Sequence, residues 1–530
     1  MGLVGWGRRN LERRLWYPAL LPLLPVLSLY TANRSEVPWP LLLRPAALVL
    51  AAATLMSWLL RRLRLDPQKA GLITAGCWLW WFGWGHFVAI TRGQPELRGV
   101  LEMYPAAVRA GWVALLVAAV AVIALGRRPP ARLGVGLNLA ALALVLAQLV
   151  MIVPHAWRSS ASTHGPVAAL PAGSAQPGQR PPDIFFIVLD GYARQDVLAR
   201  MYGYDNGPFL RGLERRGFTV LGRSTANYCQ TELSQASTLN CTYLGDLAHR
   251  LGPGSVDRVP LDRMIHDSLV SRKLRQQGYH VVELMWYAQG WEEGRAPVGW
   301  DTGRLLNGFE VLLLEMTPWP PATARGEGGQ RLTPRAECTL RMLREIGNYG
   351  GGRRPVFLFA HVLCPHPPFD LPPQRGQRLA GVPMLDLADG NYSRMSRAEY
   401  VTRYRAQLEY LNRKVEAALD RLLARAGPDA IVILMSDHGP GSRLNWDDPK
   451  RTFMKERFAN LCALRLPHGG QARLWPEMSA VNIFRVILSH YFGADLPPLP
   501  DDCYYSPWLH PYRFTKVTGR VRTEAWPGAR

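Results

Sequence analysis

The sequence lacks any pattern that would connect its positive charge to nucleic acid. Its formal net charge is +21, but the Arg and Lys residues are scattered, no basic cluster is interleaved with aromatic residues, and no nucleic-acid-binding motif is found. These absences exclude nucleic acid as a partner. Many basic residues flank apolar segments instead, so membrane topology and anionic lipid headgroups explain the charge better. The chain also has no internal repeat.

Charged residues are scarce inside five apolar runs in the first third of the chain. Each run is long enough to cross a membrane as a helix. The runs are Leu15 to Ala32, Leu41 to Leu60, Ala70 to Thr91, Ala106 to Leu125 and Leu133 to Val153. Because few ionisable residues lie within them, they offer no obvious substrate path of a transporter. A cleaved signal peptide is also disfavoured, since no cleavage site follows the first run. Arg44 and Pro45 interrupt the start of the second run.

Basic residues are distributed unevenly between the two sides of these predicted spans. One set of flanks carries eleven, and the opposite loops and span ends carry five. The eleven are Arg8, Arg9, Arg13, Arg14, Arg61, Arg62, Arg64, Lys69, Arg127, Arg128 and Arg132; the five are Arg34, Arg44, Arg92, Arg98 and Arg109. By the positive-inside rule the N-terminus is cytoplasmic. With an odd number of spans, everything after Val153 is expected outside the cytoplasmic (inner) membrane.

Composition divides the chain into four predicted parts. They are a transmembrane domain of five spans over 1–157, a flexible linker rich in Ser, Ala, Gly and Pro over 158–182, a globular domain over 183–500, and an aromatic, basic C-terminal tail over 501–530. Six of the seven cysteines lie in the outer part. Three disulfides are permitted there, but ordinary buried thiols fit equally well. Whether Cys229 and Cys241 are bonded to each other is left open.

Short apolar runs that end in potential ligands predict the fold of the globular domain. The candidate strands are Asp183 to Asp190, His280 to Met285, Pro355 to His361 and Ala430 to Asp437. Helix-like stretches between them include Asn206 to Arg216 and Arg397 to Ala426. This alternation predicts an α/β domain with a mainly parallel central sheet. In such sheets, functional groups gather outside the carboxyl ends of the strands.

Carboxylate and imidazole side chains follow two of these strands. Asp190 ends the first, and Asp437 with His438 and Gly439 ends the last. Carboxylate oxygens combined with imidazole nitrogen suit zinc or manganese. A lone acid after a strand is more often a helix cap than a ligand. The adjacent Asp437 and His438 are more specific, so the two strand ends together predict a metal site.

A segment dense in hydroxyl and amide side chains, Asn227 to Asn240, lies between these strands. Thr231, Ser234 and Ser237 recur every three residues, which puts them on about one face of a helix that begins at Thr231. Thr231 is then either the N-cap of that helix or a nucleophile. In the second case a metal would lower the pKa of its hydroxyl, and the helix N-terminus would stabilise negative charge on the transferring group.

Two histidines, His361 and His366, stand in the segment HVLCPHPP where a predicted strand ends. Pro367 and Pro368 restrain the loop that follows and so hold an imidazole rigidly. A lone histidine at such a position is usually structural. A pair of them at the same sheet edge as the other ligands favours a functional role.

These four pieces, in this order, resemble the alkaline phosphatase and sulfatase superfamily. The five spans before an external domain resemble its lipoteichoic acid synthase and phosphoethanolamine transferase branch. The resemblance implies an alkaline phosphatase-like fold with a sulfatase-like catalytic domain. It implies one divalent metal ion, manganese or zinc in preference to magnesium or calcium, held by Asp190, Thr231, Asp437 and His438. Thr231 matches the threonine nucleophile, which is also a metal ligand.

The resemblance also implies residues that bind the substrate. His366 matches the histidine that contacts the substrate phosphate, whereas His361 is the weaker member of the pair and has a structural interpretation. Ser234 accompanies the nucleophile. Arg451, with Lys455, offers positive charge to an anionic substrate, although a solvated basic face explains these two residues better.

The sequence departs from the superfamily in two places. Sulfatases carry a C-x-P-x-R motif whose Cys or Ser becomes formylglycine, but Cys229 is followed by the residues QTEL. Sulfate ester hydrolysis is therefore not expected. Phosphoethanolamine transferases have a further histidine beyond the Asp-His pair, whereas this region reads DDPKR from Asp447 to Arg451. One metal ion is therefore expected rather than two.

Together, the resemblance and the membrane anchor imply a metal-dependent phosphotransferase. It would move a phosphoglycerol or phosphoethanolamine headgroup from a membrane lipid to a glycan or lipid acceptor in the cell envelope. Two alternatives stay open. A phosphodiesterase or phosphatase-type hydrolase of the same superfamily would differ only in having water at the acceptor site. A catalytically silent membrane scaffold in envelope assembly would keep the fold without the metal.

Overall fold

The computed structural model describes residues 15–34, 37, 39–92, 94, 97, 100–101, 103–160, 181–285, 308–319, 333–371, 388–393 and 395–527. Its contacts divide the chain into two compact units. Unit 1 comprises Met1–Ser162 and Asp301–Ala322, and unit 2 comprises Thr163–Trp300 and Thr323–Arg530. Most of the predicted linker, residues 161–180, lies outside the described residues.

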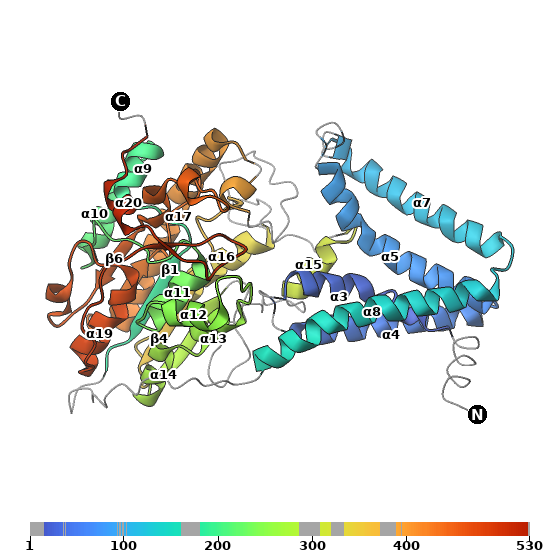
Figure 1. The fold of residues 1–530 in the computed structure, drawn as a ribbon, viewed down its shortest axis with the longest axis horizontal. Coiled ribbons are helices and arrows are strands. Elements are labelled where there is room, and N and C mark those ends of the chain that lie inside the picture. The colour runs from blue at the N-terminus through green and yellow to red at the C-terminus, as the bar shows by residue number, and fades with distance from the viewer. Residues whose placement is uncertain are drawn as a thin grey trace. The chain divides into compact units, whose positions relative to one another are not determined.

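Unit 1 consists of apolar helices, drawn mostly in blue in Figure 1. They are α2 (Tyr17–Leu20), α3 (Leu23–Ala32), α4 (Pro40–Arg62), α5 (Pro67–Arg92), α7 (Pro105–Leu125), α8 (Ala131–Ser160) and α15 (Gly308–Glu315). Three helical segments are long and apolar enough to cross a membrane: Pro40–Arg62, Pro105–Leu125 and Arg132–Trp157. All five predicted runs are helical, but the count of five spans is not confirmed. The first run is split around Pro22, and α5 carries polar residues such as Lys69 that reduce its hydropathy.

A short stretch from the middle of the chain belongs to unit 1. Helix α15 follows β3 in sequence, yet the Phe309 ring contacts the Tyr30 ring edge-on at 6.1 Å. Glu310 forms an ion pair with Arg44, and the Gly85 amide donates to the Met316 carbonyl at 3.0 Å. Nothing in the amino-acid pattern distinguishes this stretch from the globular domain around it, so its membership of unit 1 is not apparent from sequence.

Unit 2 is built on a six-stranded sheet in the order β2-β6-β5-β1-β4-β3. The strands are β1 (Ile184–Leu189), β2 (Thr219–Val220), β3 (His280–Met285), β4 (Val356–Val362), β5 (Ile431–Met435) and β6 (Cys462–Arg465). Strand β1 pairs in parallel with β4 and β5, and β3 pairs in parallel with β4. Only the short β2 and β6 are antiparallel. The prediction of an α/β domain with a mainly parallel sheet is confirmed, and all four predicted strands are present.

Helices cover this sheet (Figure 1). They are α9 (Gln195–Met201), α10 (Gly207–Arg215), α11 (Thr231–Leu239), α12 (Gly245–Leu251), α13 (Val259–His266), α14 (Leu269–Gln276), α16 (Pro334–Glu345), α17 (Arg397–Ala426), α18 (Met454–Phe458), α19 (Ile483–Phe492) and α20 (Thr518–Thr523), with 3-10 turns η1 (Ile346–Asn348), η2 (Gly390–Tyr392), η3 (Pro449–Arg451), η4 (Gly470–Arg473) and η5 (Ala480–Asn482). A small hairpin, β7 (Tyr504–Tyr505) with β8 (Thr515–Lys516), completes the unit. Helix α17 matches its predicted range because Ser396 caps its start and Gly427, at φ 84°, ends it.

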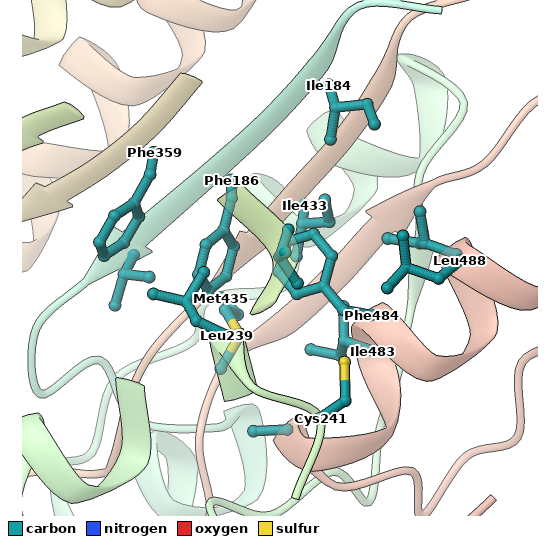
Figure 2. Packing of buried hydrophobic residues seen from close by; sticks show 14 of the residues in the cluster. Ile184, Phe186, Leu239, Cys241, Phe359, Ile433, Met435, Ile483, Phe484 and Leu488 are labelled. Carbon is teal, nitrogen blue, oxygen red and sulfur yellow. The ribbon is translucent and has the colours of Figure 1, made fainter. Parts of the chain in front are cut away.

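The hydrophobic core on one face of the sheet fixes the elements that carry the site. Phe186 of β1 stacks on Phe359 of β4 at 5.2 Å and meets Phe484 of α19 edge-on at 5.1 Å. Figure 2 shows these rings beside Leu239 of α11. Burying a large apolar side chain contributes about 1.5–3 kcal/mol. Strand β1 and helix α11 are therefore held against each other from one rigid core.

All seven cysteines lie in the described residues, and none of the seven is in a disulfide. Cys229 and Cys241 are not bonded to each other. Cys229 donates to the Ser506 carbonyl at 3.4 Å instead, and burial raises the pKa of Cys241 to about 12. The outer cysteines are therefore buried or half-buried thiols with low reactivity.

Candidate active site

The carboxyl ends of β1 and β5 bring two carboxylates and an imidazole together. Asp190 follows β1, and Asp437 with His438 follows β5, its parallel neighbour. Ligand atoms of the three side chains lie within 4.8 Å of one another. Nε2 of His438 is 3.6 Å from Oδ1 of Asp190 and 3.4 Å from Oδ2 of Asp437. Because each residue is only 1% exposed, the cluster is sheltered from water.

The charges in this cluster fit a divalent cation. Oδ1 of Asp190 and Oδ2 of Asp437 are buried and have no hydrogen-bond partner. Burial alone would raise the pKa of Asp190, but the charge of His366 and the hydrogen bond from His361 hold it well below its ordinary value. Asp190 is therefore ionised. Buried carboxylate oxygens without partners are costly unless a cation binds them, and oxygen with imidazole nitrogen is a donor set for zinc or manganese.

His438 has the protonation state that a metal ligand needs. Its Nδ1 faces the Gly439 carbonyl at 2.9 Å, so the proton is assigned to Nδ1 and the lone pair to Nε2. Burial and the nearby Arg457 guanidinium lower the pKa of His438. The ring is therefore neutral, with Nε2 directed at the carboxylates.

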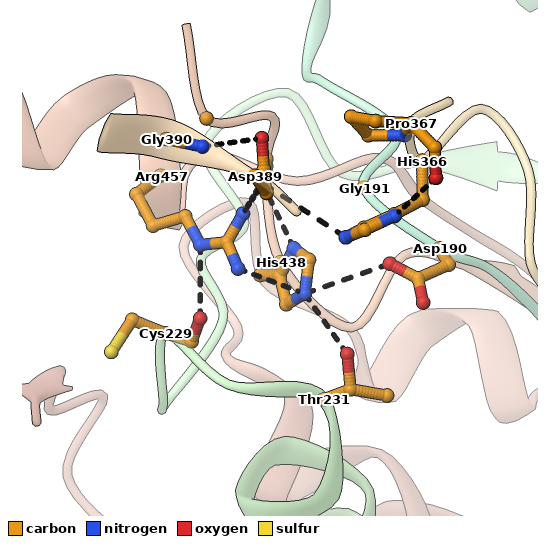
Figure 3. A network of polar contacts seen from close by, with 12 residues as sticks. Asp190, Gly191, Cys229, Thr231, His366, Pro367, Asp389, Gly390, His438 and Arg457 are labelled. Carbon is orange, nitrogen blue, oxygen red and sulfur yellow. Dashed lines mark hydrogen bonds and ion pairs between the residues drawn. The ribbon is translucent and has the colours of Figure 1, made fainter. Parts of the chain in front are cut away.

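Thr231 faces this cluster from the N-terminus of α11. The N-cap position is Gln230, and no side chain caps the helix, so Thr231 is the first helical residue. The interpretation of Thr231 as an N-cap is wrong for this reason. Its Oγ1 lies 3.1 Å from Nε2 of His438, as Figure 3 shows. The loop before the helix is held because Nε2 of Gln230 donates to Oγ of Ser506 and to the Pro507 carbonyl, both at 2.9 Å.

Of three other predicted site residues, two support the metal-ligand cluster and one does not contact it. Ser234 is buried and donates to the Asp437 carbonyl at 2.7 Å, so its hydroxyl holds the backbone of this metal ligand in place. His361 is fully buried, with Nε2 3.2 Å from Oδ2 of Asp190, and so orients that carboxylate. Arg451 is exposed in η3, and no hydrogen bond or ion pair joins it to the cluster. Lys455 donates instead to the Glu524 carbonyl of the C-terminal tail at 2.7 Å.

His366 lies at the rim of the cluster, where its side chain is 11% exposed. Its Nδ1 donates to the Pro367 carbonyl at 2.8 Å, which leaves Nε2 to handle a proton. That nitrogen lies 4.0 Å from Oδ2 of Asp389, and the ring centroid lies 6.4 Å from that of His438. Its accessible nitrogen suits a role toward a substrate.

Asp389 and Arg457 complete the polar network, and sequence reasoning missed both (Figure 3). Nη1 of Arg457 donates to Oδ2 of Asp389 at 2.9 Å, and the Tyr400 hydroxyl donates to Oδ1 at 3.0 Å. Burial would raise the pKa of Asp389, but the Arg457 guanidinium lowers it below its ordinary value. The sequence around Arg457 gives little signal, because α18 is only five residues long and shows no strand or helix pattern.

The glycines after His438 allow the Arg457 segment to approach. The Gly439 amide donates to the Arg457 carbonyl at 2.7 Å, and a Cβ on Gly439 would lie 2.0 Å from the Glu456 carbonyl oxygen. A Cβ on Gly441 would lie 2.4 Å from Oδ2 of Asp389. Glycine is therefore required at both positions for the two loops to pack.

Replacing Gly439 with alanine is expected to push α18 away from His438. Overpacking of this kind costs about 1–3 kcal/mol, so the midpoint of thermal unfolding should fall. The matched control is Gly222→Ala, because nothing lies within 4 Å of a Cβ at that position. An unfolding midpoint for Gly439→Ala equal to that of the control would show that the two loops are not tightly packed.

Comparison with known proteins now identifies the family. Residues 182–493 match the sulfatase family, and the chain therefore belongs to it. This confirms the superfamily that the motifs indicated. Comparison with curated proteins found no match.

Several solved structures are similar to this chain at low sequence identity. The C-terminal periplasmic domain of EcEptC from Escherichia coli, in complex with zinc, is 13% identical; the match covers 67% of this chain and 98% of that one, with a TM-score of 0.42. The soluble domain of lipooligosaccharide phosphoethanolamine transferase A from Neisseria meningitidis is 14% identical, covering 61% and 90%, with a TM-score of 0.37. The phosphonate monoester hydrolase of Agrobacterium radiobacter is 18% identical, covering 65% and 78%, with a TM-score of 0.37.

Proposed function

We propose that the chain is a membrane-anchored, metal-dependent transferase of phospho-alcohol headgroups, of the phosphoglycerol or phosphoethanolamine type. One observation carries the proposal: the Thr231 hydroxyl lies 3.1 Å from Nε2 of His438, beside two buried carboxylates. A hydroxyl at a helix N-terminus and next to a metal-ligand cluster has the surroundings of an activated nucleophile.

The proposed ion is a single divalent metal, zinc or manganese, held by Asp190, Thr231, Asp437 and His438. When bound, it would lower the pKa of the Thr231 hydroxyl and offset the charge of the carboxylates. The two carboxylate oxygens without partners support this assignment. They also argue against a catalytically silent scaffold, which would have no reason to keep them buried and unpaired.

In the proposed reaction, Oγ1 of Thr231 attacks the phosphorus of the donor phosphodiester. A bond forms between that oxygen and phosphorus, and the bond between phosphorus and the donor's lipid alcohol breaks. The resulting phosphothreonine diester is then attacked by an acceptor hydroxyl, which releases Thr231. Because Thr231 is the first residue of α11, the free amides of the first turn stabilise negative charge on the phosphoryl oxygens.

His366 is proposed to handle the proton in both steps. Its Nδ1 is committed to the Pro367 carbonyl, so only Nε2 exchanges a proton. In the first step Nε2 gives a proton to the departing alcohol, and in the second it takes one from the acceptor hydroxyl. Oδ2 of Asp389 lies 4.0 Å from this nitrogen, on the side of the ring away from the Pro367 carbonyl.

The membrane helices favour transfer over hydrolysis. Three helices are long and apolar enough to span a membrane, and we propose a multi-pass anchor of five spans in the inner membrane with an extracytoplasmic catalytic domain. Retention at a membrane is useful when donor, acceptor or both are lipids or growing envelope glycans. Water at the acceptor site would instead give hydrolysis.

Mass spectrometry tests the covalent step. After incubation of the purified chain with cell lipids, a phospho-adduct is expected on Thr231, and its added mass would identify the headgroup. Headgroup release from labelled phospholipids should then increase when an envelope glycan is added. Release to water alone, unchanged by any acceptor, would contradict transfer and support the hydrolase alternative.

A further inference from the structure

Arg457 is a buried cation that contacts the same His438 nitrogen as the proposed nucleophile, yet its contacts do not account for its whole guanidinium. The residue is 2% exposed. Its Nε donates to the Cys229 carbonyl at 2.9 Å, and Nη1 donates to Asp389 at 2.9 Å and to the Gly439 carbonyl at 3.0 Å. The guanidinium therefore bridges three segments. They are the nucleophile loop, which ends at Thr231, the metal-ligand loop, which follows His438, and the loop of Asp389.

The remaining nitrogen, Nη2, points into the site. A guanidinium has five N–H donors, and two of them are on Nη2. Among the described residues, Nη2 has one hydrogen-bond partner, Nε2 of His438 at 3.2 Å (Figure 3). No second acceptor for Nη2 is found within the described chain. When Nε2 of His438 serves as a metal ligand it has no lone pair left to accept, so both Nη2 donors then lack a protein partner.

Two buried donors without acceptors are costly, and an anion would satisfy them. The anion that the proposed reaction brings to this place is the transferring phosphoryl group, since His438 contacts both Thr231 and Arg457. A simple ion pair with Asp389 would need only one edge of the guanidinium. The planar guanidinium is also rigidly placed, because its Nε and Nη1 donate to two carbonyls and a carboxylate.

We propose that Nη2 of Arg457 binds a non-bridging oxygen of the transferring phosphoryl group and supplies the second positive charge of a site that holds one metal ion. This inference rests on the proposed function and deepens it, because it assigns the residue that receives the phosphate. Arg457 also positions the nucleophile loop through the Cys229 carbonyl.

Binding of inorganic phosphate to the metal-loaded, detergent-solubilised full chain tests this assignment by calorimetry. Loss of a charge-assisted hydrogen bond is expected to weaken phosphate binding by roughly 10- to 100-fold in Arg457→Gln. Arg457→Lys should keep the charge and lose less. The matched control is Arg216→Gln, because Arg216, the residue after α10, pairs with Asp420 of α17 and not with the site residues. This variant should bind phosphate like the wild type.

Metal content separates phosphate binding from a purely structural role. Arg457→Gln should retain one metal ion per chain, because no metal ligand is removed. If this variant does not fold, Asp389→Asn combined with Arg457→Gln removes both buried charges and leaves neither unpaired. Unchanged phosphate affinity in either variant, or loss of the metal in both, would overturn the inference. A phospho-adduct that forms on Thr231 equally in the wild type and in Arg457→Gln would contradict the role of Arg457 and leave the proposed function intact. Absence of the adduct in the wild type would contradict the proposed function.

Discussion

Replacement of Thr231 by alanine is expected to abolish headgroup transfer. The side-chain oxygen that attacks phosphorus is removed, and Ser234 does not take its place, because it is buried and donates to the Asp437 carbonyl. Loss of a nucleophile typically lowers kcat by roughly 10⁴-fold or more. The measurement is transfer of a labelled headgroup from phospholipid vesicles by the solubilised chain, followed by mass spectrometry of the nucleophile peptide.

Thr231→Ser is the matched variant, because it keeps the hydroxyl and removes one methyl group. It should retain measurable transfer and carry the phospho-adduct on the new hydroxyl. The fold should be unaffected in both variants, since Thr231 is only half-buried. Transfer by Thr231→Ala at the wild-type rate, or an adduct on another residue of that variant, would exclude Thr231 as the nucleophile.

Replacement of Asp190 or Asp437 by asparagine is expected to remove the metal and, with it, activity by roughly 10³-fold or more. Each substitution replaces a charged ligand oxygen that is buried without a hydrogen-bond partner. In metal-free protein the same substitution should raise the midpoint of thermal unfolding, because it relieves repulsion between buried like charges. Metal analysis and thermal unfolding of the metal-free chain are the two measurements.

Asp183→Asn provides a control at the opposite end of the same strand. Asp183 is also buried, but its oxygens accept from the amides of Val356 and Gly351, both at 2.8 Å. This variant should lower stability and keep the metal. The account would be contradicted if the Asp190 and Asp437 variants kept a full complement of metal, or if metal-free stability fell in all three variants alike.

Local patterns in the sequence were sufficient for the elements that hold the proposed metal ligands. The parallel strands are buried on both faces, so they read as continuous apolar runs, and the ligands follow at their carboxyl ends. Asp190, Asp437 and His438 could be placed together because the carboxyl ends of β1 and β5 meet at one sheet edge. Helix α17 has clear cap residues, which is why its two ends were predicted correctly.

The residues that sequence reasoning missed depend on packing between distant segments. Arg457 is on a helix of five residues, and its position becomes meaningful only because Gly439 allows the two loops to touch. Arg451 and Lys455 were predicted from their charge, but they do not reach the site. Charge alone does not determine which way a side chain faces. The antiparallel β6 was missed for a different reason, since it has only four residues, ends in Arg465 and gives no long apolar run.

The count of membrane spans shows a different limit. Apolar length identified helices correctly, but a proline within the first run splits it into α2 and α3. Proline removes a backbone donor and disfavours a continuous helix. Conversely, Pro45 lies inside α4 without ending it, so the expected interruption of the second run is not seen.

Anomalous X-ray diffraction at the zinc or manganese edge, from crystals of the metal-loaded full chain, tests the central idea most directly. One strong peak should lie among the side-chain oxygens of residues 190, 231 and 437 and the ring nitrogen of His438. An ion bound elsewhere in the molecule, or this cluster left without density in crystals saturated with metal, would contradict the account.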